Sequence, residues 1–113
     1  MSRAVKHMSE TTKMVALDID GTLLESGVGF DAVPGEGITD AVTKLQDAGV
    51  VVVLATGRMF PGAKLIAEHL GLLQPVICQQ GASTHESNGE LRRSFTIEPD
   101  ITRELFDYAT EHK

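Results

Sequence analysis

Short apolar runs alternate with amphipathic segments along the first two thirds of the chain. Runs at residues 14–17, 50–55 and 75–78 carry no charge and end at polar residues, which is typical of strands buried on both faces. Apolar residues at i, i+3, i+4 and i+7 from Ile38 predict a helix after the first run, and an apolar stripe over residues 61–70 predicts another after the second. This order of elements predicts an α/β fold with a parallel sheet and right-handed crossovers.

The pattern changes after the third apolar run. Residues 82–97 hold the turn signal Asn88-Gly89 between two polar–apolar segments, which predicts a hairpin. Pro99 then opens a last amphipathic helix. We therefore expect a disordered leader over residues 1–12, one structural unit over 13–83, and the start of another unit over 84–113.

Composition excludes several classes of protein. The chain has 113 residues and a formal net charge of -6, and it carries one cysteine, Cys78. No apolar run approaches the roughly 20 residues needed to span a bilayer, residues 1–13 lack the apolar region of a signal peptide, and no internal disulfide can form. The acidic balance offers no basic stripe for phosphate backbones. These features predict a cytoplasmic protein that binds neither membrane nor nucleic acid.

Polar side chains follow each of the three expected strands. Asp18 and Asp20 follow the first strand, Thr56 follows the second, and Gln79 and Gln80 follow the third. Ligands of open parallel sheets bind beyond the carboxyl ends of the strands. The sequence therefore predicts one crevice that contains all five residues.

Two carboxylates on one side of a strand end can divide the work of group transfer. Asp18 and Asp20 are two residues apart, so they point to the same side of an extended chain. One can attack an electrophile while the other moves a proton, Mg²⁺ can screen both acids, and the Thr56 hydroxyl can hold a phosphoryl oxygen. On the residues alone, the same pattern also fits an ordinary turn with two exposed acids.

The two motifs together resemble one family. Asp18-Ile19-Asp20-Gly21-Thr22-Leu23-Leu24 followed by Ala55-Thr56-Gly57-Arg58 resembles the haloacid dehalogenase superfamily of phosphohydrolases, in its Cof-type branch of sugar-phosphate phosphatases. The resemblance covers about residues 13–83. It implies a Rossmann-like parallel sheet, the first three strands of that family's core, and an incomplete α/β cap over residues 84–113. It also implies a Mg²⁺-dependent phosphatase acting on a sugar phosphate or a similar small phosphate monoester.

The resemblance assigns a role to each matching residue. Asp18 would be the nucleophile that becomes an aspartyl-phosphate and also a Mg²⁺ ligand. Asp20 would be the general acid and base, and its main-chain carbonyl oxygen would be the other Mg²⁺ ligand. Thr56 and Gly57 would bind the transferring phosphoryl group. The substrate contacts would be Arg58, Gln80 and Gly81, although Gln80-Gly81-Ala82 stands where the family usually has Asn-Gly-Ala, and the glycine-rich segment after Leu24 would be a mobile flap.

Two parts of the family pattern have no counterpart in the sequence. A lysine that steadies the phosphate and a second acidic pair that completes the metal site are absent, and Lys64 lies at the wrong position to replace the lysine. Without the strand that carries the acidic pair, residues 14–17 would form an exposed apolar edge, which favours self-association or a complementing fragment. The alternative function is therefore an inactive fragment that serves as a binding module. A receiver-like domain is a third, weaker reading, since it needs an acid where Gln79 and Gln80 stand.

Overall fold

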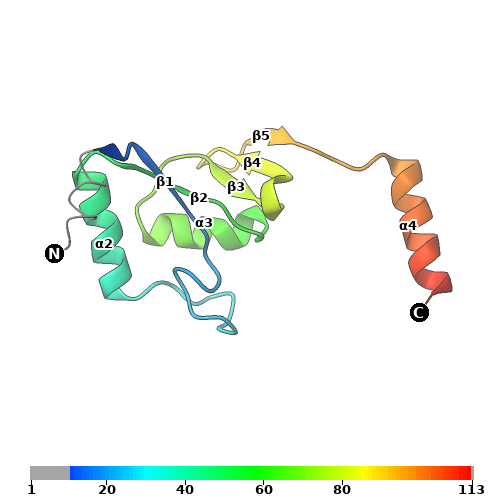
Figure 1. Cartoon of the computed structure of the whole chain (residues 1–113), viewed down its shortest axis with the longest axis horizontal. Helices are drawn as coiled ribbons and strands as arrows, with labels where there is room; N and C mark the ends of the chain where they lie inside the picture. The colour runs from blue at the N-terminus through cyan, green and yellow to red at the C-terminus, as the bar shows by residue number, and fades with distance from the viewer. Residues whose placement is uncertain (1–10, 113) are drawn as a thin grey trace.

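The chain forms a small parallel sheet with two helices on one face, a β-hairpin that continues the strands, and a separate last helix (Figure 1). The computed structural model describes residues 11–112. Its elements are β1 (Met14–Leu17), α2 (Glu36–Asp47), β2 (Val51–Leu54), α3 (Phe60–His69), β3 (Val76–Cys78), β4 (Ser83–His85), β5 (Leu91–Ser94) and α4 (Pro99–Glu111).

The strand pairing confirms the α/β prediction. β1 and β2 are parallel and in register from Met14 opposite Val51 to Leu17 opposite Leu54. β3 continues this order through a parallel bridge between Ala55 and Ile77. On its other side β3 pairs with β4 antiparallel, and β4 pairs with β5 as the hairpin that the Asn-Gly turn predicts.

No break in the sheet separates the two units expected from the sequence. The boundary between residues 83 and 84 falls inside β4, and the strand order β3-β4-β5 is continuous across it. The division into a core and the start of a cap therefore stays a prediction. Most of the expected leader lies on residues 1–10, outside the described residues.

Proline and glycine mark the ends of α2 and α3, as the sequence predicts. Pro61 occupies the first turn of α3, where its missing N–H costs nothing. Gly49 after α2 and Gly71 after α3 have φ of +83° and +67°, the left-handed conformation in which glycine ends a helix without strain.

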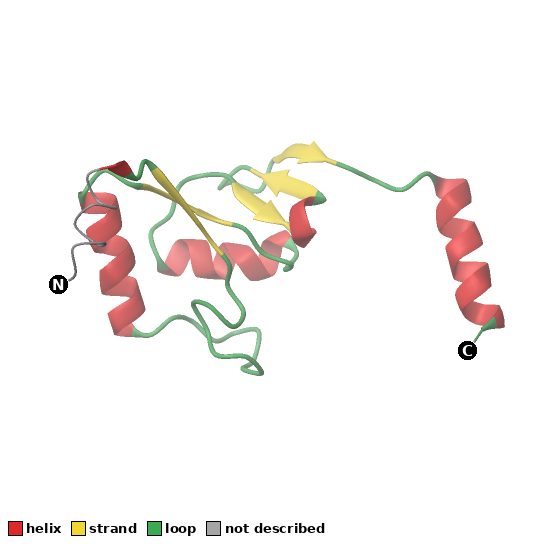
Figure 2. Ribbon diagram, viewed as in Figure 1, coloured by secondary structure: helices red, strands yellow, loops and turns green. Residues whose placement is uncertain are grey.

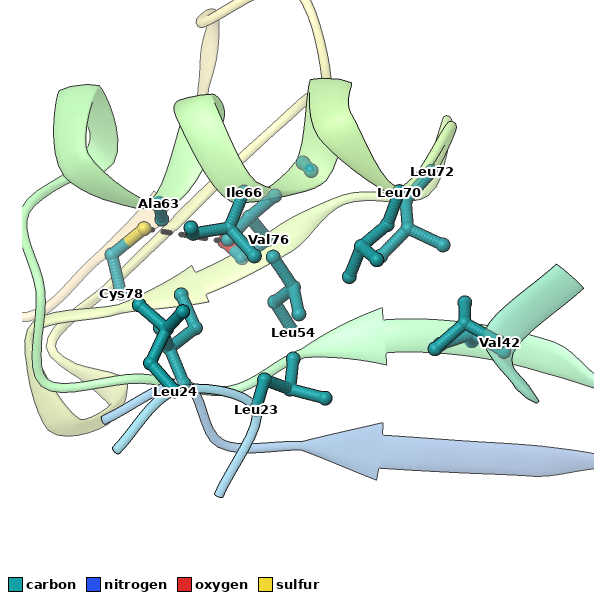
Figure 3. Close-up of a cluster of buried hydrophobic side chains, with 13 residues drawn as sticks. Leu23, Leu24, Val42, Leu54, Ala63, Ile66, Leu70, Leu72, Val76 and Cys78 are labelled. Atoms are coloured by element: carbon teal, nitrogen blue, oxygen red, sulfur yellow. Dashed lines mark hydrogen bonds between the residues drawn. The ribbon is translucent and has the colours of Figure 1, made fainter. Parts of the chain in front are cut away.

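One apolar cluster joins both helices to the sheet (Figure 3). Val52 and Leu54 of β2 point to one face of the sheet. They pack in one cluster with Val42 of α2 and Ile66 of α3, so both helices cover that face. Cys78 is fully buried in this cluster, and burial raises the pKa of its thiol. The buried members of the cluster are Ile19, Leu23, Leu24, Val42, Val52, Leu54, Ala63, Ile66, Ala67, Leu70, Leu72, Val76 and Cys78.

The opposite face of the sheet is uncovered, so the expectation that residues 14–17 are buried on both faces is wrong. Met14 is 58% exposed and Ala16 is exposed as well. Two right-handed crossovers that move in the same direction along a sheet put both helices on one side. β1 also has no strand beyond its outer edge within residues 11–112. This face carries no helix within residues 11–112, and it is exposed at Met14 and Ala16, partly exposed at Val51 and Ile77, and buried at Val53. It is called the open face below.

The helices bury narrower stripes than their periodicity predicts. Ile38 and Leu65 remain more than a third exposed, and His69 is exposed. Ala63 and Ala67 of α3 are buried instead, since small side chains allow the helix to approach the strands closely. The helix positions were therefore predicted correctly, but the width of each buried face was not.

α4 lies apart from the rest of the molecule (Figure 2). An extended segment leads to it from β5, and none of its residues is buried. Among the residues that the structure describes, no helix has both the length and the apolar content needed to cross a bilayer.

Truncation of a core leucine should destabilise the fold far more than truncation of a surface leucine. We expect Leu54→Ala to lower the free energy of unfolding by about 2–5 kcal/mol, because Leu54 is 1% exposed and a cavity would remain. Leu73→Ala, at a leucine that is 82% exposed, should change it by no more than about 0.5 kcal/mol. Urea unfolding followed by circular dichroism measures both, and equal losses would contradict the described core.

Candidate active site

The first acidic motif lies on a turn that is held by hydrogen bonds to the main chain of a buried residue. Ile19 is fully buried, and its carbonyl oxygen accepts hydrogen bonds from the main-chain N–H groups of Thr22, Leu23 and Leu24 at 2.9–3.1 Å. Asp18 and Asp20, on either side of Ile19, are exposed. Ile19 is therefore turned into the core, while the two aspartates beside it remain exposed.

The parallel register brings the second motif beside the first. The Ala55 N–H donates to the Leu17 carbonyl oxygen at 2.8 Å, and the Thr56 N–H donates to the Ile77 carbonyl oxygen at 2.9 Å. Asp18 follows Leu17 directly, so it leaves the sheet at the same edge as Thr56. The structure thus brings together the ends of β1, β2 and β3.

Thr56 and Gly57 present two donors at this edge. The Thr56 side chain is buried, and its Oγ1 accepts a hydrogen bond from the Arg58 N–H at 3.0 Å, which leaves the hydroxyl proton free to be donated. The Gly57 N–H donates to no residue in the described part of the chain. A hydroxyl proton and an adjacent main-chain N–H suit an anionic oxygen.

Arg58 binds Asp20 through two parallel hydrogen bonds. Nε donates to Oδ2 and Nη2 donates to Oδ1, both at 2.8 Å. The arginine side chain is 5% exposed and the aspartate side chain 50%. The hydrogen bonds from Arg58 hold the pKa of Asp20 below its usual range, and the same bonds raise the pKa of Arg58.

Arg58 makes two further contacts. Nη1 donates to the Gly62 carbonyl oxygen at 3.1 Å, and the Phe30 ring, on the glycine-rich segment, lies 5.6 Å from the guanidinium carbon. Three of the five N–H donors of the guanidinium are therefore used within the described chain, and Nη1 and Nη2 each keep one more. The pair with Asp20 joins residues 38 positions apart, and the spacing of the motifs gave no signal for it.

A tight turn after β3 closes the site on its other side. Gln79 and Gln80 both have positive φ, +52° and +57°. Gln79 N–H donates to the Arg58 carbonyl oxygen at 2.9 Å, and Gln80 N–H donates to the Thr56 carbonyl oxygen at 3.1 Å. These two bonds tie the turn to the main chain on both sides of Gly57.

An open hollow of about 230 Å³ lies at this end of the sheet. This is less than the roughly 300–1,000 Å³ of pockets that take drug-sized ligands, and it suits a small group. Its lining residues are Ala55, Thr56, Ile77, Gln80 and Gly81. Of the expected site residues, Thr56, Gln80 and Gly81 line this hollow, whereas Asp18, Asp20 and Gln79 do not, so it does not contain all five residues of the predicted crevice.

The acids at the site form a sparse metal-ligand set. Within residues 11–112, no three His, Cys, Asp or Glu side chains come together as a metal cluster. Asp18 Oδ1 accepts a hydrogen bond from the Ile19 N–H at 2.7 Å, and both carboxylate oxygens of Asp20 are held by Arg58. Mg²⁺ usually binds one or two carboxylates and keeps several waters. Asp18 fits such a site, whereas the Asp20 carboxylate fits it only when released from Arg58.

Known proteins match the chain over most of its length. The profile of the haloacid dehalogenase-like hydrolase family matches residues 15–113. The 5-amino-6-(5-phospho-D-ribitylamino)uracil phosphatase YcsE of Bacillus subtilis is 29% identical over 88% of this chain and 39% of its own length. The phosphatase YwpJ of the same organism is 37% identical over 76% of this chain and 29% of its own.

A solved structure shares the fold. A phosphatase of the haloalkanoate enzyme superfamily from Bacteroides thetaiotaomicron superimposes with a TM-score of 0.75 at 27% identity, over 99% of this chain and 38% of its own. The chain thus spans between 29% and 39% of the length of these proteins.

Removal of Arg58 should change the titration of Asp20. We expect Arg58→Gln to raise the pKa of Asp20 towards its ordinary value, because the two charge-assisted hydrogen bonds are lost. In the unaltered chain the lowered pKa stabilises the fold above the pKa of an unfolded aspartate, about 3.9, and that contribution is lost as the pH falls through the folded value. The Asp20 carboxyl carbon shift, followed by NMR against pH, measures the effect.

The exposed arginine of α4 supplies the control for this titration. Arg103→Gln removes a cation that lies 3.8 Å from Asp100 on α4 and should leave the titration of Asp20 unchanged. An Asp20 pKa that is equal in the unaltered chain and in Arg58→Gln would show that the pair does not persist in solution.

Proposed function

Because the chain belongs to the haloacid dehalogenase-like hydrolase family, we propose that it carries the phosphoryl-transfer residues of a phosphatase for a small phosphate monoester, such as a sugar phosphate. One observation carries this proposal: an exposed nucleophile, Asp18, leaves the sheet beside the two free donors of Thr56 and Gly57. A carboxylate next to anion-binding donors suits attack on phosphorus.

Asp18 supplies the nucleophile. A carboxylate oxygen of Asp18 attacks phosphorus, the bond from phosphorus to the ester oxygen breaks, and an aspartyl-phosphate forms. Thr56 and Gly57 donate hydrogen bonds to the phosphoryl oxygens, whose negative charge changes during the transfer. Water then attacks phosphorus, the bond to Asp18 breaks, and inorganic phosphate leaves with the free carboxylate restored.

Asp20 moves the protons in both steps. As a carboxylic acid it gives a proton to the leaving alkoxide, and as a carboxylate it takes one from the attacking water. Arg58 favours the carboxylate form, so Asp20 can act as an acid only after at least one of its oxygens leaves the guanidinium. Arg58 therefore orients Asp20 in the described arrangement.

The donor set supports Mg²⁺ as the cofactor. Asp18, through its carboxylate, and Asp20, through its main-chain carbonyl oxygen, would hold the ion. Bound Mg²⁺ would neutralise charge on the phosphoryl oxygens and on the nucleophile.

Lys64 does not take the place of the lysine that the family pattern requires. It pairs with Glu68 on the exposed side of α3, at 3.7 Å. Within residues 11–112 no cation pairs with Asp18, and the inactive binding module is the alternative to a working phosphatase. For either function we keep the cytoplasm as the expected location.

The nucleophile can be tested by a charge-neutral substitution. We expect Asp18→Asn to abolish Mg²⁺-dependent hydrolysis of p-nitrophenyl phosphate, with a loss of at least about 100-fold, because an amide cannot form the acyl phosphate. Asp47→Asn, at an exposed acid at the opposite end of the sheet, is the matched control and should keep full activity. If the unaltered chain shows no turnover above Asp18→Asn, the binding-module alternative is favoured.

We also propose that the open face and the outer edge of β1, which no strand covers within residues 11–112, bind a second copy of the chain. Met14, Val53 and Ile77 line an apolar hollow of about 380 Å³ on this side of the sheet. An uncovered edge strand with apolar side chains favours association.

Sedimentation velocity tests the association. At tens of micromolar we expect the chain to sediment as a dimer, and Ala16→Lys, which puts a charge on the open face, should shift it to monomer. Ala48→Lys at the exposed end of α2 is the control. A monomer over the whole concentration range would contradict self-association.

A further inference from the structure

The turn that follows β3 is strained at two consecutive residues. Neither Gln79 nor Gln80 belongs to the residue types that favour positive φ, so both conformations cost free energy. The hydrogen bonds to the main chain of Thr56 and Arg58 maintain them, together with a bond from the buried Ser83 hydroxyl to Gln79 Oε1 at 3.0 Å. The turn is therefore held in one conformation against its local preference.

This conformation lays the Gln80 side chain over Gly57. A Cβ on residue 57 would come within 2.7 Å of Gln80 Nε2 and 3.2 Å of its Cδ, so the carboxamide occupies the space that glycine leaves open. The carboxamide makes no hydrogen bond with the described residues. The carboxamide of Gln79, by contrast, accepts the hydrogen bond from Ser83 and so helps to fix the turn.

Three unused donors consequently meet at one end of the sheet. They are the Thr56 hydroxyl, the Gly57 N–H and the Gln80 carboxamide, and the hollow lined by Thr56 and Gln80 lies beside them. A buried hydroxyl and a main-chain amide are fixed by the fold, whereas the glutamine is placed there by a strained turn.

We propose that Gln80 is a third phosphoryl ligand at this site, with its Nε2 donating to a nonbridging oxygen of a phosphoryl group held by Thr56 and Gly57. This inference rests on the proposed function and adds a third ligand to its anion site.

Binding of inorganic phosphate tests the third donor without requiring turnover. Titrations of the full chain with inorganic phosphate in the presence of Mg²⁺, followed through the amide shift of Gly57, give the dissociation constant. We expect Gln80→Met, which keeps the length and removes the donor, to weaken binding roughly tenfold. Gln80→Glu should weaken it further, on the order of 100-fold, because it places a negative charge beside the anion.

Two further variants separate the donor from the strain and from general effects. Gln80→Asn keeps an amide, tolerates positive φ better, and withdraws the donor from above Gly57. It should therefore weaken phosphate binding severalfold without lowering the urea midpoint. Gln74→Met, at an exposed glutamine before the opposite end of β3, should change neither quantity.

The possible results distinguish the inference from the proposed function. Phosphate binding that Thr56→Val weakens and Gln80→Met leaves unchanged would overturn the role of Gln80 alone. Absence of any phosphate-induced shift at Gly57 in the unaltered chain would overturn both, since no phosphoryl site would exist. A loss confined to the Gln80 variants and Thr56→Val supports the inference.

Discussion

The in-register pairing of β1 with β2 determines the geometry of the whole candidate site. Leu17 lies opposite Leu54, so the chain leaves both strands at the same level and Asp18 emerges beside Thr56. A shift of one residue in β2 would turn Leu54 away from the helices and expose the core. The apolar packing that stabilises the fold therefore also fixes which polar residues meet at the edge of the sheet.

Local chemistry decides where elements lie, and this part could be predicted from the sequence. The strands, the helices and the hairpin lie where apolar periodicity and turn residues placed them. Burial could not be predicted in the same way, because it depends on what covers each face. Met14, Ile38 and Leu65 belong to regular apolar patterns and still remain exposed, since no neighbouring element covers them in the described chain.

The candidate site was predictable to a similar extent. Asp18, Asp20 and Thr56 follow strands, and strand ends gather at one edge, so their proximity follows from the order of elements. The pair of Arg58 with Asp20 depends on how two turns approach each other in space. Gln79 and Gln80 gave no sign of positive φ, because hydrogen bonds to distant main-chain groups, and not their own preference, impose it.

The strand order also determines how much of the site is enclosed. β1, β2 and β3 follow one another in a single direction, with the motif of Asp18 at the outermost strand. A crevice in an open α/β sheet forms where the strand order reverses, so the described residues build one wall of such a crevice. Within the described part of the chain, Asp18 is accordingly exposed. At high dielectric each charge in the site acts more weakly on a bound anion, so enclosure would strengthen every contact made there.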